Sequence, residues 1–265
     1  MSGGKSGGKP AGRCGIIAAM TDARLAASYV QLLYEYLAGL GHDPLALLGP
    51  LPAAHFVPLP VWQAQLARAA QLDPRPALGL RIAEGIGARH FGVVGYAALA
   101  CDTLLDALQR LERYHASVYD VNPARVSLRE EGLCIEWGVE RGQPGALVDE
   151  TALACLMRLT RDMTGRPLRA RELGFVNPRP ADLRPYEDFF GCPVHFEQAS
   201  TRLVLATQDL ALPMRKSDPA LLALLDRQAE RLLQELGVAM PAALAAYRMS
   251  LVALIREGET SLAAL

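Results

Sequence analysis

Two pairs of short alternating segments, set between amphipathic helices, constrain the fold of this chain more than any other feature. Residues 124–129 (ARVSLR) and 133–139 alternate apolar and polar side chains on either side of a Glu130-Glu131-Gly132 turn. This pattern predicts a hairpin with one buried face. The segments CPVHFE and TRLVLA predict a second hairpin. Hairpins with helices before, between and after them indicate an α+β fold with a largely antiparallel sheet.

The helices are marked by apolar residues at helical spacing and by recognisable ends. They are predicted at about 21–39, 60–69, 76–86, 103–118, 149–164, 183–190 and 218–236. Thr103 and Asp106 resemble a capping box. The apolar stripe of that helix is Leu104, Leu108, Leu111, His115 and Val118, with Arg110, Glu112 and Arg113 mostly off it. We therefore expect a helical N-terminal layer packed on a sheet made from two hairpins, with a long C-terminal linker helix.

Composition excludes several classes of protein. The 265 residues carry a formal net charge of -1, with basic and acidic residues alternating, so the chain lacks the basic face of a free-standing DNA-binding module. The five cysteines are widely spaced and form no C-x-x-C, which argues against a disulfide framework. No stretch approaches the roughly 20 apolar residues needed to cross a bilayer. We expect a cytoplasmic protein that does not contact a membrane.

The motifs of catalysis are missing from the sequence. It has no G-x-S-x-G, H-E-x-x-H, P-loop or G-x-G-x-x-G, and its five histidines are not spaced as zinc ligands. We expect no enzyme, no catalytic residue, no metal and no cofactor. The main alternative to a sensor is an interaction or dimerisation module without a small ligand, and a hydrolase that uses a cysteine or histidine is a weaker one.

Several polar and aromatic side chains lie close to apolar runs. His115, within Tyr114-His115-x-x-x-Tyr119, is either a core histidine bonded to a carbonyl or a polar group that faces a ligand, because ligand pockets are mostly apolar with a few placed polar groups. Trp137 is either core or a cavity wall, and Glu136 either lines that wall or is solvated on the other face. The acidic residues nearest apolar runs, any of which could pair with an amine, are Glu84, Glu136, Asp149 and Glu150.

Two segments resemble the ligand-binding domain found at the N-terminus of a large AraC/XylS subgroup, the arabinose-binding type. Residues 90–115 (HFGVVGYAALACDTLLDALQRLERYH) are similar to its Phe-Gly-x-x-Gly-Tyr-Ala and Thr-Leu-x-x-Ala-Leu patterns. Residues 185–205 (PYEDFFGCPVHFEQASTRLVL) resemble its Phe-Phe-Gly-Cys-Pro-Val-x-Phe signature. Asp218-Pro219 fits the start of the family's linker helix. The resemblance spans about 24–240, and ornithine-utilisation-type regulators are the most similar subgroup.

The resemblance implies the sensor part of a bacterial transcription regulator. A small metabolite, with an amine or amino acid favoured, would be its effector, and DNA would be reached only through a missing C-terminal domain. The Gly-, Ser- and Lys-rich residues 1–20 are expected to be disordered. Residues 21–238 are expected to form the effector-binding and dimerisation domain. Residues 239–265 would be a linker helix and the first turns of a truncated helix-turn-helix domain.

Two sets of residues follow as candidates. The expected ligand contacts are Phe91, Tyr96, Tyr114, His115, Tyr119, Glu136 and Trp137. The expected homodimer contacts, on the 218–236 helix, are Leu222, Leu225, Leu232 and Leu236. Packing of that same helix on its own domain is an equal alternative.

Overall fold

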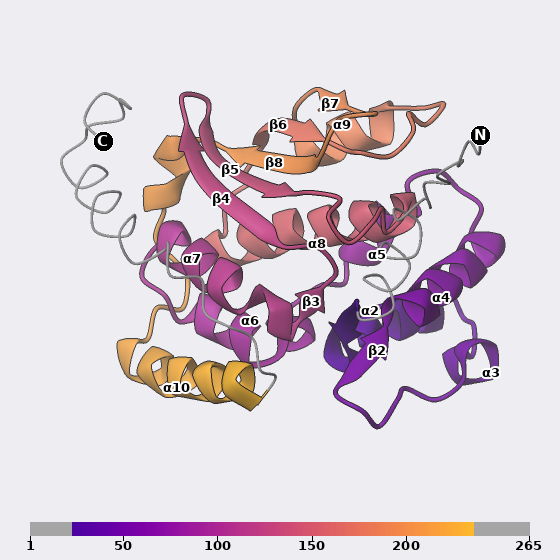
Figure 1. Ribbon diagram of the computed structural model, residues 1–265, viewed down its shortest axis with the longest axis horizontal. Coiled ribbons are helices and arrows are strands. Elements are labelled where there is room, and N and C mark those ends of the chain that lie inside the picture. Colours follow the sequence, from indigo (N-terminus) through magenta and orange to yellow (C-terminus); the bar gives the residue numbers. More distant parts are fainter. Residues whose placement is uncertain (1–22, 236–265) are drawn as a thin grey trace, which may run out of the picture.

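The computed structural model describes residues 23–235 and confirms the α+β class (Figure 1). The predicted segments 1–20 and 239–265, together with Leu236, lie outside the described residues. The strands are β1 (Arg24–Ala26), β2 (Phe56–Pro58), β3 (Tyr119–Asp120), β4 (Ala124–Arg129), β5 (Gly132–Trp137), β6 (Ala170–Gly174), β7 (Val194–His195) and β8 (Thr201–Leu205). The α-helices are α2 (Ala27–Gly39), α3 (Pro44–Leu48), α4 (Leu59–Leu72), α5 (Leu78–Ala83), α6 (Gly92–Leu99), α7 (Leu104–Tyr114), α8 (Ala146–Thr164), α9 (Arg184–Phe190) and α10 (Pro219–Glu235). Short 3-10 helices are η1 (Ala88–Phe91), η2 (His115–Ser117) and η3 (Thr207–Ala211).

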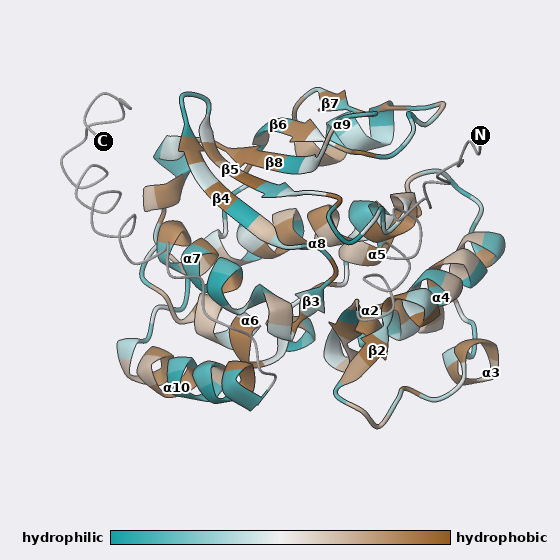
Figure 2. Cartoon of the chain, viewed as in Figure 1, coloured by the Kyte–Doolittle hydropathy of each residue, from teal (hydrophilic) through white to brown (hydrophobic). Residues whose placement is uncertain are grey.

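A five-stranded sheet forms one layer, in the order β4-β5-β8-β6-β7. The β4–β5 hairpin is confirmed, with Val126 opposite Ile135 and Ala124 opposite Trp137. Alternate residues of β4 are exposed, and Figure 2 shows the same alternation in hydropathy along this strand. Because successive side chains of a strand point to opposite faces, Val126, Ile135 and Trp137 share the face that is directed toward the helices.

The predicted second hairpin is wrong. β7 pairs in parallel with β6, while β8 lies between β5 and β6 and is antiparallel to both. The segment between β7 and β8 bonds to the residues after β6 instead of turning back on itself, because the Glu197 and Gln198 amides donate to Asn177 and Phe175 carbonyls. Each strand was predicted from its own alternation, but its neighbour depends on contacts with a distant segment.

The N-terminal layer is helical, as expected, but it also contains a three-stranded antiparallel sheet that the sequence pattern did not predict. Its order is β2-β1-β3. The first helix therefore starts at Ala27 and not near residue 21, because Arg24–Ala26 are extended and pair with both neighbours. This small sheet brings β3, with Tyr119, beside the start of α2.

Helix α8 is the central support of the protein. Most of its residues are buried, and it lies beneath the sheet in Figure 1. It ends where the sequence predicts, at Gly165, whose φ of 67° is the left-handed conformation that glycine adopts readily. Helix α5 packs closely on α8, and Gly79 makes this approach possible, since an added Cβ would lie 2.7 Å from the backbone nitrogen of Thr151.

Helices α7 and α10 both begin with the predicted caps. The Thr103 hydroxyl accepts from the Asp106 amide at 3.3 Å, and Asp218 accepts from the Ala220 and Leu221 amides at 3.1 and 3.0 Å. Helix α10 lies against α6 and α7 (Figure 1), with Ala229 and Leu233 buried. The described part of this helix therefore packs on its own domain.

The leucines predicted to form a dimer are only partly available on α10. Leu222 packs against the core, and Leu225 and Leu232 are half-buried. The exposed leucines of this helix are instead Leu221 and Leu224.

Candidate effector cavity

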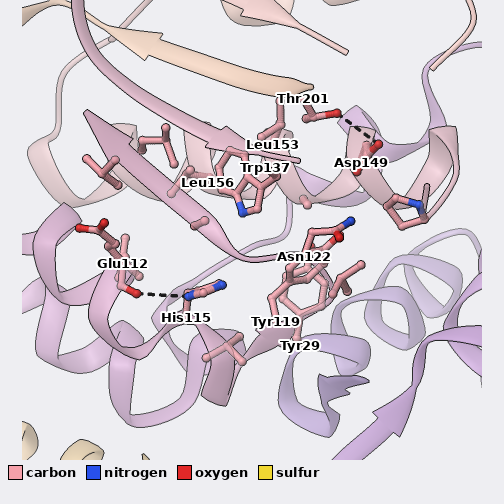
Figure 3. A pocket seen from close by; sticks show the side chains of 18 of the residues that line it. Tyr29, Glu112, His115, Tyr119, Asn122, Trp137, Asp149, Leu153, Leu156 and Thr201 are labelled. Carbon is pink, nitrogen blue, oxygen red and sulfur yellow. Dashed lines mark hydrogen bonds between the residues drawn. The ribbon is translucent and has the colours of Figure 1, made fainter. Parts of the chain in front are cut away.

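A cavity of about 90 Å³ lies between the inner face of the sheet, α7, α8 and the β3 segment. Figure 3 shows the side chains that line it. Its apolar lining includes Val94, Leu108, Leu111, Val118, Val121, Val126, Ile135, Leu153, Leu156 and Val176. Its aromatic and polar lining is Tyr29, Phe91, Glu112, His115, Tyr119, Asn122, Trp137, Asp149 and Thr201. None of the lining residues described is a lysine or an arginine.

One face of α7 forms a wall of the cavity. A helix turns by about 100° per residue, so Leu108, Leu111, Glu112 and His115 point in one direction, and all four line the cavity. The prediction that Glu112 lies mostly off this stripe is therefore wrong. Glu112 lies four residues after Leu108, and this spacing in the sequence predicts that both side chains lie on the same face of the helix.

Four of the seven residues predicted to contact a ligand are brought together by the structure. Phe91, His115, Tyr119 and Trp137 all line the cavity, although they come from four different elements. The ring of Tyr29, at the start of α2, links two of them, with centroids 5.9 Å from Phe91 and 6.0 Å from Tyr119 in edge-on geometry.

The other three predicted residues lie outside the cavity lining. Tyr96 is 48% exposed on α6. Tyr114 is buried, but it lies beneath the guanidinium of Arg113, which is 5.4 Å from its ring centre. Glu136 points to the opposite face of β5 from Trp137, where it accepts from Arg129 at 3.0 Å. Because successive side chains of a strand point to opposite faces, Trp137 faces the cavity and Glu136 faces away from it.

Asp149 is the most deeply buried carboxyl of the cavity. It lies in the first turn of α8 and is 7% exposed. Its Oδ2 accepts from Asn177 Nδ2 at 2.7 Å and from Thr201 Oγ1 at 3.4 Å. Burial nevertheless dominates, and it raises the pKa of this carboxyl to about 6. At neutral pH the cavity therefore holds a carboxylate that is costly to keep charged.

Burial also shifts the pKa values of two other side chains in the cavity, Glu112 and His115. Burial raises the pKa of Glu112 to about 7, and the Val126 amide only partly opposes this effect. Burial lowers the pKa of His115, whose Nδ1 is 3.2 Å from the Glu112 carbonyl oxygen. His115 is therefore neutral at pH 7, and the cavity contains no fixed positive charge from its described lining.

Two tyrosine hydroxyls in the cavity are buried and have no hydrogen-bond partner among the described residues. They belong to Tyr119 and to Tyr29, and the Tyr29 hydroxyl has only the thiol of Cys155 close to it. Burial, followed by the charge of Asp149, raises the pKa of Tyr119 well above its usual value, so its hydroxyl lies within electrostatic reach of that carboxylate. Buried hydroxyls in native proteins are nearly always paired, so these two mark where a ligand's polar group would be bound.

Sequence reasoning missed Tyr29, Asn122 and Thr201 as cavity residues. Tyr29 falls within the first predicted helix and Thr201 within the predicted strand TRLVLA, but neither was singled out, and Asn122 lies between the predicted elements. Asp149 was one of four acidic candidates with nothing to separate it from the others. Asp149 differs from the other three because it lines the cavity on one side of α8, and that difference depends on tertiary structure.

Within residues 23–235, no group of three or more histidine, cysteine or acidic side chains is arranged to hold a metal ion. Across the same range, no helix has the length and apolar character needed to cross a membrane.

Comparisons with known proteins give a family, a curated relative and a shared fold. A family model described as the arabinose-binding domain of AraC transcription regulators, N-terminal, matches residues 34–214. The ornithine utilization regulator of Pseudomonas aeruginosa is 30% identical over 178 residues, which are 66% of this chain and 52% of that protein. The transcriptional regulator CdpR from Pseudomonas aeruginosa superposes with a TM-score of 0.55 at 19% identity, over 88% of this chain and 80% of CdpR. The chain thus spans about half the length of the curated relative that it matches.

Proposed function

Because the chain belongs to the family of AraC transcription regulators with an N-terminal arabinose-binding domain, we propose that its cavity binds a small metabolite whose occupancy controls a helix-turn-helix DNA-binding domain beyond this chain. The relatives are regulators and not enzymes. An amine or amino acid is the favoured effector, because both carry an ammonium group and the lining holds the acidic side chains of Glu112 and Asp149. The ornithine regulator among the relatives supports the same class.

The observation that carries this proposal is the double role of α7. While Leu108, Glu112 and His115 line the cavity, the opposite face of the same helix holds α10. Arg110 binds Asp226 with nitrogen–oxygen distances of 3.0–3.2 Å, and Arg113 binds Glu230 at 2.9 Å. A helix that touches both the ligand and the linker is a direct physical connection between them.

The effector would act by shifting a population. A ligand changes a conformational equilibrium only as far as its affinity differs between the two states. In one state α7 would hold α10 as described, and in the other α7 would shift against the cavity and weaken the two ion pairs. Linkage makes the effect reciprocal, so loosening α10 would change effector affinity by the same factor, typically about 5–150-fold.

A thermal-denaturation screen of small amines, amino acids and short carboxylates tests for the effector. A ligand at a hundred times its Kd adds about 2.7 kcal/mol to stability. Ala152→Leu on α8 would fill part of the cavity and should abolish the shift, while Ala223→Leu, at an exposed position of α10, should keep it. Failure of all compounds, or a shift that survives Ala152→Leu, would favour an interaction module without a small ligand.

The coupling has its own test. Arg110→Ala removes the more buried of the two contacts with α10 and should change effector affinity without altering the cavity. Amide hydrogen exchange along α10, with and without effector, should change in the wild type and lose that response in the variant. Equal exchange with and without bound effector in the wild type would contradict the role of α7.

A homodimer through α10 remains a proposal, with its contacts revised. Leu221 and Leu224 are 44% and 48% exposed and would supply the apolar contact, with half-buried Leu225 and Leu232 beside them. Leu224→Lys should then shift the sedimentation coefficient from dimer to monomer. Val139→Lys is the control, because Val139 is also exposed, at 40%, but follows β5 and is not part of α10.

A further inference from the structure

The polar end of the cavity contains a buried carboxylate, and none of its described lining residues is a lysine or an arginine. Both donors to Asp149 reach the same oxygen, Oδ2, and neither reaches Oδ1. Within the described residues Asp149 takes part in no salt bridge. A buried carboxylate without a cationic partner is costly, and a cation from a ligand would offset that cost.

The neighbouring hydroxyls match the needs of an ammonium group. A primary ammonium donates three hydrogen bonds. Asp149 Oδ1 and Tyr119 Oη have no partner among the described residues, and Tyr29 Oη has only the Cys155 thiol beside it, which is a weak hydrogen-bond partner. Figure 3 shows Tyr29 and Tyr119 between His115 and Asp149. The negative face of a tyrosine ring also attracts a nearby cation.

A carboxylate on the ligand would find no cationic partner in the described lining of this cavity. Its described lining supplies no arginine or lysine to pair with one, and His115 is neutral at pH 7. Glu112 lies at the opposite end from Asp149 in Figure 3, so a carboxylate at either end would meet an acidic side chain. The middle of the cavity, with Trp137 and Leu156, suits an apolar chain.

We infer that the effector is a primary amine that carries no carboxylate, with its ammonium held by Asp149, Tyr119 and Tyr29 and its hydrocarbon part against Trp137 and Leu156. The inference rests on the proposed function, because it names the ligand of the same cavity. It also separates this chain's effector from an amino acid, in which ammonium and carboxylate occur together.

Isothermal titration of the 265-residue chain at pH 8 with butylamine, 1,4-diaminobutane, 1-butanol, butyrate and ornithine tests the inference. Butylamine or 1,4-diaminobutane should bind at least about tenfold more tightly than the alcohol, butyrate or ornithine, the equivalent of a charge-assisted hydrogen bond. If ornithine or butyrate binds most tightly and Ala152→Leu abolishes that binding, the inference is overturned and the proposed function stands. If none of the five binds, the inference is overturned and the effector role itself loses support.

Variants locate the ammonium. Asp149→Asn should weaken amine binding about 30-fold or more, since it removes the negative charge that attracts the cation, and Tyr119→Phe about fivefold, since it removes one hydrogen bond. Glu112→Gln removes the other carboxyl of the cavity and should have the smallest effect of the three. Melting temperatures of the free variants show that each is folded. A larger loss for Glu112→Gln than for Asp149→Asn would overturn the assignment.

Discussion

Two adjacent carboxyls on α8, Asp149 and Glu150, face two different surroundings. Both are buried, at 7% and 5% exposed, and burial raises the pKa of both. Each oxygen of Glu150 has its own donor, because the Gly79 amide lies 2.5 Å from Oε1 and the Tyr186 hydroxyl 2.7 Å from Oε2. Asp149 has donors on one oxygen only and opens onto the cavity.

The comparison shows that burial does not distinguish a structural acid from a ligand-binding one. Glu150 joins α8 to the start of α5 and to α9, and its bonding is complete. The bonding of Asp149 is incomplete, and the surrounding fold tolerates this. Removing Glu150 should therefore weaken the protein, whereas neutralising Asp149 should strengthen it.

The largest effect is expected for Glu150→Ala. This change leaves the Gly79 amide and the Tyr186 hydroxyl buried without their acceptor, at a cost of about 1–3 kcal/mol for each group. We expect the free energy of unfolding in urea to fall by about 3–4 kcal/mol, with Glu187→Ala, at an exposed position of α9, as the control. A loss below about 1 kcal/mol would remove the distinction between the two carboxyls.

Gly79→Ala tests the close packing behind Glu150. The new methyl group would meet the backbone nitrogen of Thr151 at 2.7 Å, so α5 and α8 must separate. We expect a loss of about 2–3 kcal/mol by urea denaturation, as for other overpacked cores. Gly85→Ala is the matched control, because its nearest neighbour, a methyl carbon of Leu32, lies at an ordinary 3.5 Å. Equal losses for the two variants would show that the α5–α8 contact is adaptable.

Asp149→Asn should stabilise the ligand-free protein above pH 7 by about 2 kcal/mol, since it removes a charge whose burial is unfavourable. The folded-state pKa of about 6 lies above the ordinary 3.8, so the wild type gains stability as the pH falls from 7 toward 4 and the folded state takes up a proton. The advantage of the variant should therefore shrink over this range. Glu112 and His115 are present in both proteins and cancel in the difference.

Thermal melts at pH 5 and pH 8 measure this difference between the wild type and Asp149→Asn. An advantage of the variant that is the same at both pH values would contradict the raised pKa. A variant less stable than the wild type at pH 8 would mean that Asp149 is structural, like Glu150.

The smallest effects compare two tyrosines. Tyr186→Phe removes a donor to Glu150 and should cost about 1–2 kcal/mol. Tyr119→Phe removes a hydroxyl that has no partner among the described residues and should change stability by less than about 0.5 kcal/mol. Urea denaturation of both variants, without added amine, checks the pair. Similar losses would show that the Tyr119 hydroxyl is bonded in solution in the free protein.

Local signals predicted much of the fold because their physical cause is local. The caps at Thr103 and Asp218 and the alternation of β4 and β5 depend on neighbours in sequence, and all are confirmed. The parallel pairing of β7 with β6 was missed because it depends on contacts with a segment about 20 residues earlier.

The site shows the same division. Helical spacing was enough to place His115 on the inner face of α7, whereas Tyr96 and Glu136 were chosen by residue type and lie elsewhere. The open side of Asp149 arises from α8, β3 and β8 together, and no single stretch of sequence carries that information.

The two ion pairs that hold α10 differ in how far dissolved ions can reach them. Arg113 and Glu230 are 34% and 45% exposed, against 17% and 27% for Arg110 and Asp226. Dissolved ions screen exposed pairs more strongly than sheltered ones, so a rise in potassium should release the end of α10 nearest Glu230 first.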